Sequence, residues 1–125
     1  RGKTMKTLKI TVLCLILCIS VITCKKKGGK LIIDSNVIEK SQNSIVVKFG
    51  SPIVNTPGNR HWICLAKEGS EDREWGAWVM VPDNAMQVEI PFRGYVTEGK
   101  WELRLHNQYN TLPFHVIARR KVTVR

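Results

Sequence analysis

The chain has 125 residues, 20 of them basic and 10 acidic, which gives a formal net charge of +10. This length excludes a large multidomain enzyme, and the hydrophobic share of 43% with 24% charged residues is typical of a globular protein rather than a disordered one. Eight basic residues and no acid lie in residues 1–30, so residues 31–125 carry 12 basic against 10 acidic residues, a net charge of only +2. The basicity belongs to the N-terminal segment, and we therefore expect no nucleic-acid partner.

The first predicted element is a signal helix in residues 1–23. Lys6 and Lys9 precede a charge-free run from Ile10 to Cys24. As a helix this run would reach about 22 Å, short of the roughly 30 Å hydrocarbon core of a bilayer. A basic stretch followed by a short apolar run is the pattern of a secretory signal peptide, with Met5 as the expected start and residues 1–4 upstream of it. A short membrane anchor and a buried core helix are the alternatives.

The end of this run, Val21-Ile22-Thr23-Cys24, resembles a bacterial lipobox. The resemblance implies lipidation at Cys24, a membrane partner through its acyl chains, and export to the cell envelope, with Lys25 favouring the outer membrane of a double-membrane bacterium. Residues 24–30 then form a lipidated cysteine and a basic tether, which either rests on anionic headgroups or is a plain solvated linker. Ordinary cleavage after Ser20 is the alternative.

Residues 31–125 are predicted to form one all-β domain. Short runs rich in β-branched and aromatic residues alternate with turn formers, which predicts about seven strands. They are expected at 31–33 together with 37–38, 45–49, 60–67, 76–81, 86–90, 101–105 and 114–124. This spacing favours an antiparallel β-sandwich, with a small barrel as the alternative. The turn formers Gly50-Ser51-Pro52 are expected to end the second strand.

Alternation predicts which side chains face the core. In residues 101–105, Trp101, Leu103 and Leu105 share one face, which we expect to be buried, together with Trp62 and Trp78 from their own strands. Glu102 and Arg104 share the other face, where an acid and a base two residues apart are typical of a solvated sheet surface. No chemistry is expected from that pair.

The apolar positions of these strands resemble a bacterial Ig-like sandwich of the WIGLY or SKICH type, found beside exported hydrolases and in surface proteins. The residues that carry the resemblance are Trp62-Ile63-x-Leu65, Trp78, Pro91, Gly99-x-Trp101-Glu102-Leu103-Arg104-Leu105 and Val116-Ile117-Ala118-Arg119 with Val122-Thr123-Val124. The resemblance implies an Ig-like fold for nearly all of residues 31–125. It implies no catalytic residue.

No pattern in the sequence predicts an enzyme, a metal site or a cofactor. His61, His106 and His115 lack the paired spacing of a zinc site, and neither a nucleophile elbow nor a phosphate-binding loop is found. Cys64, the lone cysteine of residues 31–125, lies in an apolar run and is expected to be buried and structural. The acidic loop Glu68–Glu74 is expected to be a solvated hairpin loop rather than a calcium site.

The candidate ligand contacts are Trp75, at the edge of the acidic loop, and Tyr109, in a polar loop. An exposed Trp can stack on a sugar ring or anchor a protein partner, although Trp75 can also fold over the end of the sandwich. We therefore expect a monomeric, non-enzymatic lipoprotein that acts as a protein-interaction or adhesion module. The alternative is a carbohydrate-binding or accessory domain for an exported hydrolase.

Overall fold

The computed structural model describes residues 30–125, and the predicted signal helix, the predicted lipidation site Cys24 and residues 25–29 of the predicted tether lie outside this range. Residues 30–125 contain strands and no helix. No segment of this range is therefore a helix capable of crossing a bilayer. The strands are β1 (Leu31–Ile32), β2 (Val37–Ile38), β3 (Ser44–Ile53), β4 (Trp62–Lys67), β5 (Ala77–Met80), β6 (Ala85–Pro91), β7 (Gly99–Asn107) and β8 (His115–Val124).

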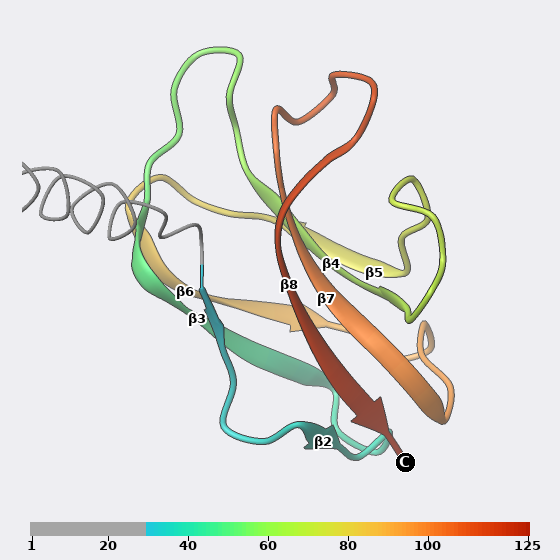
Figure 1. Cartoon of the computed structure of the whole chain (residues 1–125). Coiled ribbons are helices and arrows are strands. Elements are labelled where there is room, and N and C mark those ends of the chain that lie inside the picture. Colours follow the sequence, from blue (N-terminus) through green and yellow to red (C-terminus); the bar gives the residue numbers. More distant parts are fainter. Residues whose placement is uncertain (1–29) are drawn as a thin grey trace, which may run out of the picture.

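The strands form two sheets that pack as a sandwich (Figure 1). The smaller sheet has the order β1-β3-β6 and the larger has the order β2-β8-β7-β4-β5. The all-β prediction is confirmed, but the described residues hold eight strands, because the chain changes sheets between β1 and β2. All neighbours are antiparallel except β2 and β8, which are parallel.

The core lies between the sheets and follows the predicted alternation. Trp101, Leu103 and Leu105 of β7 are buried against the inward residues of β3. Burying each such apolar side chain contributes about 1.5–3 kcal/mol, so this layer supplies much of the driving force for folding. The fully buried side chains of the layer include Val47, Ile63, Leu65, Val81, Ile90, Phe92, Leu103 and Leu105.

The predicted turn at Gly50-Ser51-Pro52 is wrong, because β3 continues through it to Ile53. The pairing of β3 with β6 shifts register between Lys48 and Ile53. Residues inside such an irregularity are released from the regular ladder, so Pro52 can lie in a strand without removing a required N–H donor.

The outer face of the larger sheet is covered around β4 and β7, whereas the alternation in residues 101–105 predicted a solvated face. In β4 both faces are buried: Ile63 and Leu65 point to the core, whereas Trp62, Cys64 and Ala66 form a second cluster on the outer side. The loops that follow β4 (residues 68–76) and β7 (residues 108–114) cover this side. The predicted solvated face of β7 is therefore wrong, since Glu102 and Arg104 are both buried there.

Candidate functional site

Trp62 is the centre of an aromatic cluster on the outer face of the larger sheet. Its ring is only 5% exposed and stacks on the imidazole of His106, its cross-strand partner, with 3.9 Å between ring centroids. A flat contact of this kind fixes the orientation of the indole. Trp62 therefore gives the cluster a rigid base anchored on the two central strands β4 and β7.

Four further rings stand at steep angles around Trp62. Their planes are inclined to the indole by 65–89°, and their centroids lie 5.8–6.5 Å from its centroid. The four are Trp75, Trp78, Tyr109 and Phe114. They form two pairs, Trp75 with Phe114 at 6.0 Å and Trp78 with Tyr109 at 6.1 Å.

These rings and Asn110 line a pocket of about 200 Å³, which we call the aromatic pocket. Trp75 is 52% exposed, Trp78 40% and Tyr109 41%, so the walls of the pocket are open to solvent while its base is buried. The lining residues come from two stretches of the chain: residues 62–78, which span β4, the loop 68–76 and the start of β5, and residues 109–114 of the loop after β7. A preformed concave site of this kind is a default candidate for ligand binding.

Arg104 holds the loop of residues 68–76 against the sheet. Its side chain is 1% exposed, and its guanidinium donates to the backbone carbonyls of Ser70 and Glu71, each at 2.7 Å. It also donates to the Ser70 hydroxyl at 3.1 Å and to the Glu102 carboxylate at 2.8 Å. The acidic loop is therefore not simply solvated, because its backbone is fastened to a buried cation next to Trp75.

The charge of Arg104 is balanced by a network of ion pairs. Arg119 bridges Glu102, at 3.0 Å, and Asp72 of the loop, at 2.7 Å. Burial alone would raise the pKa of Glu102, but hydrogen bonds from Arg104 and Arg119 hold that pKa below its usual range. The hydrogen bond from Arg119 likewise lowers the pKa of Asp72. Both carboxylates are thus charged at neutral pH and complete the anchoring of the loop.

Gly76 allows the chain to approach β4 closely, which brings Trp75 to the aromatic pocket. Its N–H donates to the Leu65 carbonyl, and a Cβ at this position would lie 2.7 Å from that oxygen, so a side chain is excluded. The close approach places Trp75 just before β5, outside the regular strand. Trp75 and Trp78 therefore reach the same pocket, although three residues apart on one strand they would face opposite ways.

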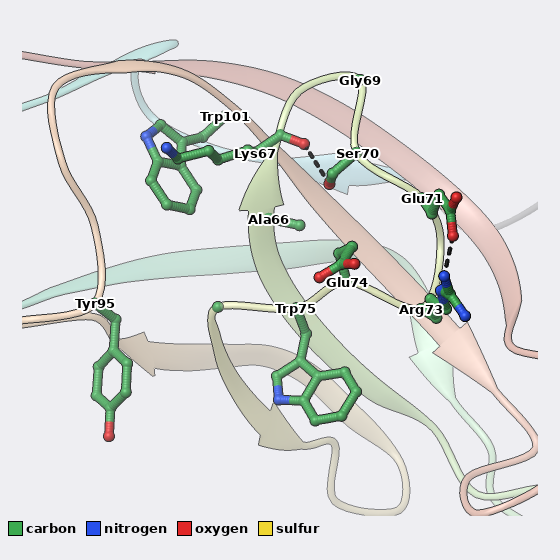
Figure 2. Close-up of a pocket in the computed structure, with 11 residues that line it drawn as sticks. Ala66, Lys67, Gly69, Ser70, Glu71, Arg73, Glu74, Trp75, Tyr95 and Trp101 are labelled. Carbon is green, nitrogen blue, oxygen red and sulfur yellow. Dashed lines mark hydrogen bonds and ion pairs between the residues drawn. The ribbon is translucent and has the colours of Figure 1, made fainter.

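A second pocket lies on the other side of Trp75, with a volume of about 520 Å³ (Figure 2). Its lining mixes aromatic rings with charged and hydroxyl groups, and we call it the polar pocket. Figure 2 shows Trp75, Tyr95 and Trp101 around it, together with the carboxylate of Glu74, the residue before Trp75 in the loop 68–76. Lys67 lies over the ring of Trp101, its ammonium 5.9 Å from the centroid. Trp75 is thus shared by the two pockets.

Cys64 and His106 are neighbours beneath the aromatic cluster. The Cys64 Sγ lies 3.6 Å from His106 Nε2, and both side chains are fully buried. Burial raises the pKa of Cys64 to about 12 and lowers the pKa of His106 to about 4. At neutral pH the pair is a thiol and a neutral imidazole, not the thiolate that nucleophilic chemistry needs. The prediction that Cys64 is buried is confirmed.

We expect the buried neutral His106 to make the protein less stable in mild acid. Its folded pKa of about 4 lies below the 6.5 of an exposed His, so between these values the unfolded chain binds more protons. The free energy of unfolding should then fall by up to about 1.4 kcal/mol per pH unit as the pH drops from 6 to 5. Urea unfolding at pH 7, 6 and 5 measures this slope.

His106→Phe is the control for that slope. The substitution keeps an aromatic ring on Trp62 and removes the titration, so the slope should shrink markedly. A remainder is expected from His61, whose pKa burial also lowers. Glu102 and Asp72, whose folded pKa values are lowered, lose their stabilising charge only in more acidic solution. An unchanged slope in His106→Phe would show that another group causes it.

The structure brings the two predicted contacts, Trp75 and Tyr109, into one pocket. Trp62 and Phe114 are further members that were not predicted, and the predicted place of Trp78 in the core is wrong. Trp78 lies on the outer face of an edge strand, next to Cys64 of β4, where Trp62 and Tyr109 pack against it and leave it 40% exposed. A useful signal was available in the apolar residues at every position of Trp62–Ala66, a pattern of strands buried on both faces.

Among residues 30–125, no group of three or more His, Cys, Asp or Glu side chains could hold a metal ion. His61 is instead bound to Asn55, whose Oδ1 lies 2.8 Å from His61 Nδ1 and also accepts the His61 N–H at 2.9 Å. These contacts shape the loop that enters β4.

No family model matches this chain, and no curated protein matches it either.

Proposed function

We propose that this protein is a non-enzymatic recognition module that binds its partner through the aromatic pocket. The observation that carries the proposal is the preformed group of five aromatic rings, three of them more than one-third exposed, around a single concavity. Exposed Trp and Tyr side chains supply much of the energy at protein interfaces, because they bury a large rigid area at little entropic cost. Because Trp75, Trp78 and Tyr109 remain partly exposed to solvent in this fold, their rings are available to bind a partner.

The fixed positions of these rings also support the proposal. Loop 68–76 is fastened by a buried cation, and Trp75 is placed by a glycine that admits no side chain. A site held by such packing and hydrogen bonds loses little conformational entropy when its ligand arrives.

We further propose that the module is an Ig-like sandwich attached to the bacterial cell envelope through acylated Cys24. The two-sheet architecture supports the fold, and the lipobox-like Val21–Cys24 supports the anchor. Mass spectrometry of the mature N-terminal peptide tests the anchor. We expect an acylated peptide that begins at Cys24 and that disappears in Cys24→Ala, whereas a free N-terminus near Val21 would indicate a soluble exported domain.

Photo-crosslinking tests the role of the aromatic pocket directly. A benzoylphenylalanine at position 78 keeps an aromatic group at the pocket wall, whereas the same residue at position 86 is exposed on β6 of the other sheet. We expect a discrete product in envelope preparations from position 78 only, and its loss when Tyr109→Ala is added. Equal labelling from both positions, or none, would contradict the proposal.

The polar pocket supports carbohydrate binding as a second candidate function. Aromatic rings beside carboxylate and hydroxyl groups, here Trp75 and Tyr95 with Glu74 and Ser70, provide both a stacking surface and hydrogen-bond partners for a sugar. A glycan array probed with Tyr95→Ala and Tyr109→Ala separates the two sites. Loss of a glycan signal in Tyr95→Ala alone would place a sugar in the polar pocket.

A further inference from the structure

We propose that the aromatic pocket recognises a quaternary or methylated ammonium group on its partner. This inference rests on the proposed function and names the chemical group that the same site accepts. The expected ligand is a cation with an apolar methylated surface; an uncharged apolar side chain and a sugar are the alternatives.

The ring geometry is that of a box. Trp62 forms the buried base, and the four other rings stand around it at 65–89° to its plane. Perpendicular rings can direct several π faces toward one point, and the negative face of each ring attracts a cation within about 6 Å of its centroid. A methylated ammonium suits such a box because its charge is spread over a rounded apolar surface that needs no hydrogen bond.

Among the described residues, no basic side chain in the lining of the pocket opposes a cation. Within the described part of the chain, the lining is five aromatic rings and Asn110, with no basic side chain. Arg104, the nearest buried cation in the sheet, is engaged by Glu102 and the carbonyls of loop 68–76. His106, stacked beneath Trp62, is held neutral by its burial, so the imidazole itself adds no positive charge under the base.

The same lining disfavours a sugar in this pocket. A sugar presents hydroxyl groups all round, and buried hydroxyls need hydrogen-bond partners. Apart from the indole N–H groups, the side chains of the lining offer only the Tyr109 hydroxyl and the Asn110 amide. The carboxylates and hydroxyls that a sugar requires lie on the far side of Trp75, in the polar pocket.

A pair of isosteric probes tests the inference. Choline and 3,3-dimethylbutan-1-ol have the same shape, but only choline carries a positive charge. The full chain, held in a non-ionic polyoxyethylene detergent, is titrated with each probe while the indole N–H signals of the tryptophans are followed by NMR. We expect choline to shift the Trp62, Trp75 and Trp78 signals in a saturable way and to bind about tenfold more tightly than the alcohol. Trp101, which lies outside the lining, should not shift.

Two matched variants test whether choline binds in the aromatic pocket. Tyr109→Ala should weaken choline binding severalfold, whereas Tyr95→Ala, the same change in the polar pocket, should leave it unaltered. Equal affinity for both probes, or binding lost in Tyr95→Ala instead, would overturn the inference.

The proposed function is tested separately from this inference. If choline fails to bind while position 78 still crosslinks to a partner, the cation inference is wrong and the recognition module stands. If neither occurs, both are wrong.

Discussion

Arg104→Met is expected to lower the free energy of unfolding by about 3–5 kcal/mol. Arg104 is buried, so its replacement removes the donor for the Ser70 and Glu71 carbonyls and one of the two cations that neutralise buried Glu102. Most of this loss of stability comes from the buried carbonyl and carboxylate groups, which would then lack a hydrogen-bond donor. Loop 68–76 should also detach from the sheet, which would move Trp75 and disturb the aromatic pocket.

Arg73→Met is the matched control for this prediction. Arg73 makes the same type of ion pair, with Glu71 at 2.7 Å, but both side chains are about 70% exposed. Exposed pairs of this kind contribute little, so Arg73→Met should change the free energy of unfolding by no more than about 0.5 kcal/mol. Urea denaturation of both variants at pH 7 measures the difference. Similar values for the two variants would show that Arg104 is not a structural anchor.

Trp62→Ala is expected to cost about 3–5 kcal/mol of stability and to abolish ligand binding. The indole is 95% buried, stacks on His106 and contacts the four rings of the pocket walls, so its removal leaves a cavity at the base of the site. The surrounding strands β4 and β7 lie in the middle of the larger sheet and cannot collapse into that space.

Trp78→Ala separates the structural from the binding contribution. Trp78 lines the same pocket, but its side chain is 40% exposed and it lies on the edge strand β5, so the expected loss of stability is only about 1–2 kcal/mol. Binding should nevertheless weaken strongly in both variants. Thermal unfolding and the choline titration measure the two effects, and a fully stable Trp62→Ala protein would contradict the role assigned to the base of the pocket.

The sequence predicted the strands better than it predicted their outer surfaces. Alternation in residues 101–105 correctly placed Trp101, Leu103 and Leu105 in the core, because the side chains of a strand must alternate between its two faces. The same alternation assigned Glu102 and Arg104 to solvent. Periodicity distinguishes the two faces, but it does not show whether a loop from elsewhere covers the second one.

The candidate site was predicted in part for the same reason. Their positions as aromatic residues in or beside polar loops predict Trp75 and Tyr109 as contacts, and both line the aromatic pocket. Trp62 and Trp78 occupy apolar strand positions, a pattern that predicts burial in the core. Their membership of the pocket depends on the path of loops 68–76 and 108–114 across the sheet, which no local pattern contains.

The sequence by itself determined the all-β architecture, the inward face of the central strands and the burial of Cys64. These features follow from local alternation and from the cost of leaving apolar side chains in water. Only the tertiary structure decided that Arg104 became the buried anchor of a loop and that five rings from two distant stretches of the chain, residues 62–78 and 109–114, meet around one concavity. Such contacts join residues distant in the chain, and their free energy depends on three-dimensional packing that a one-dimensional pattern does not encode.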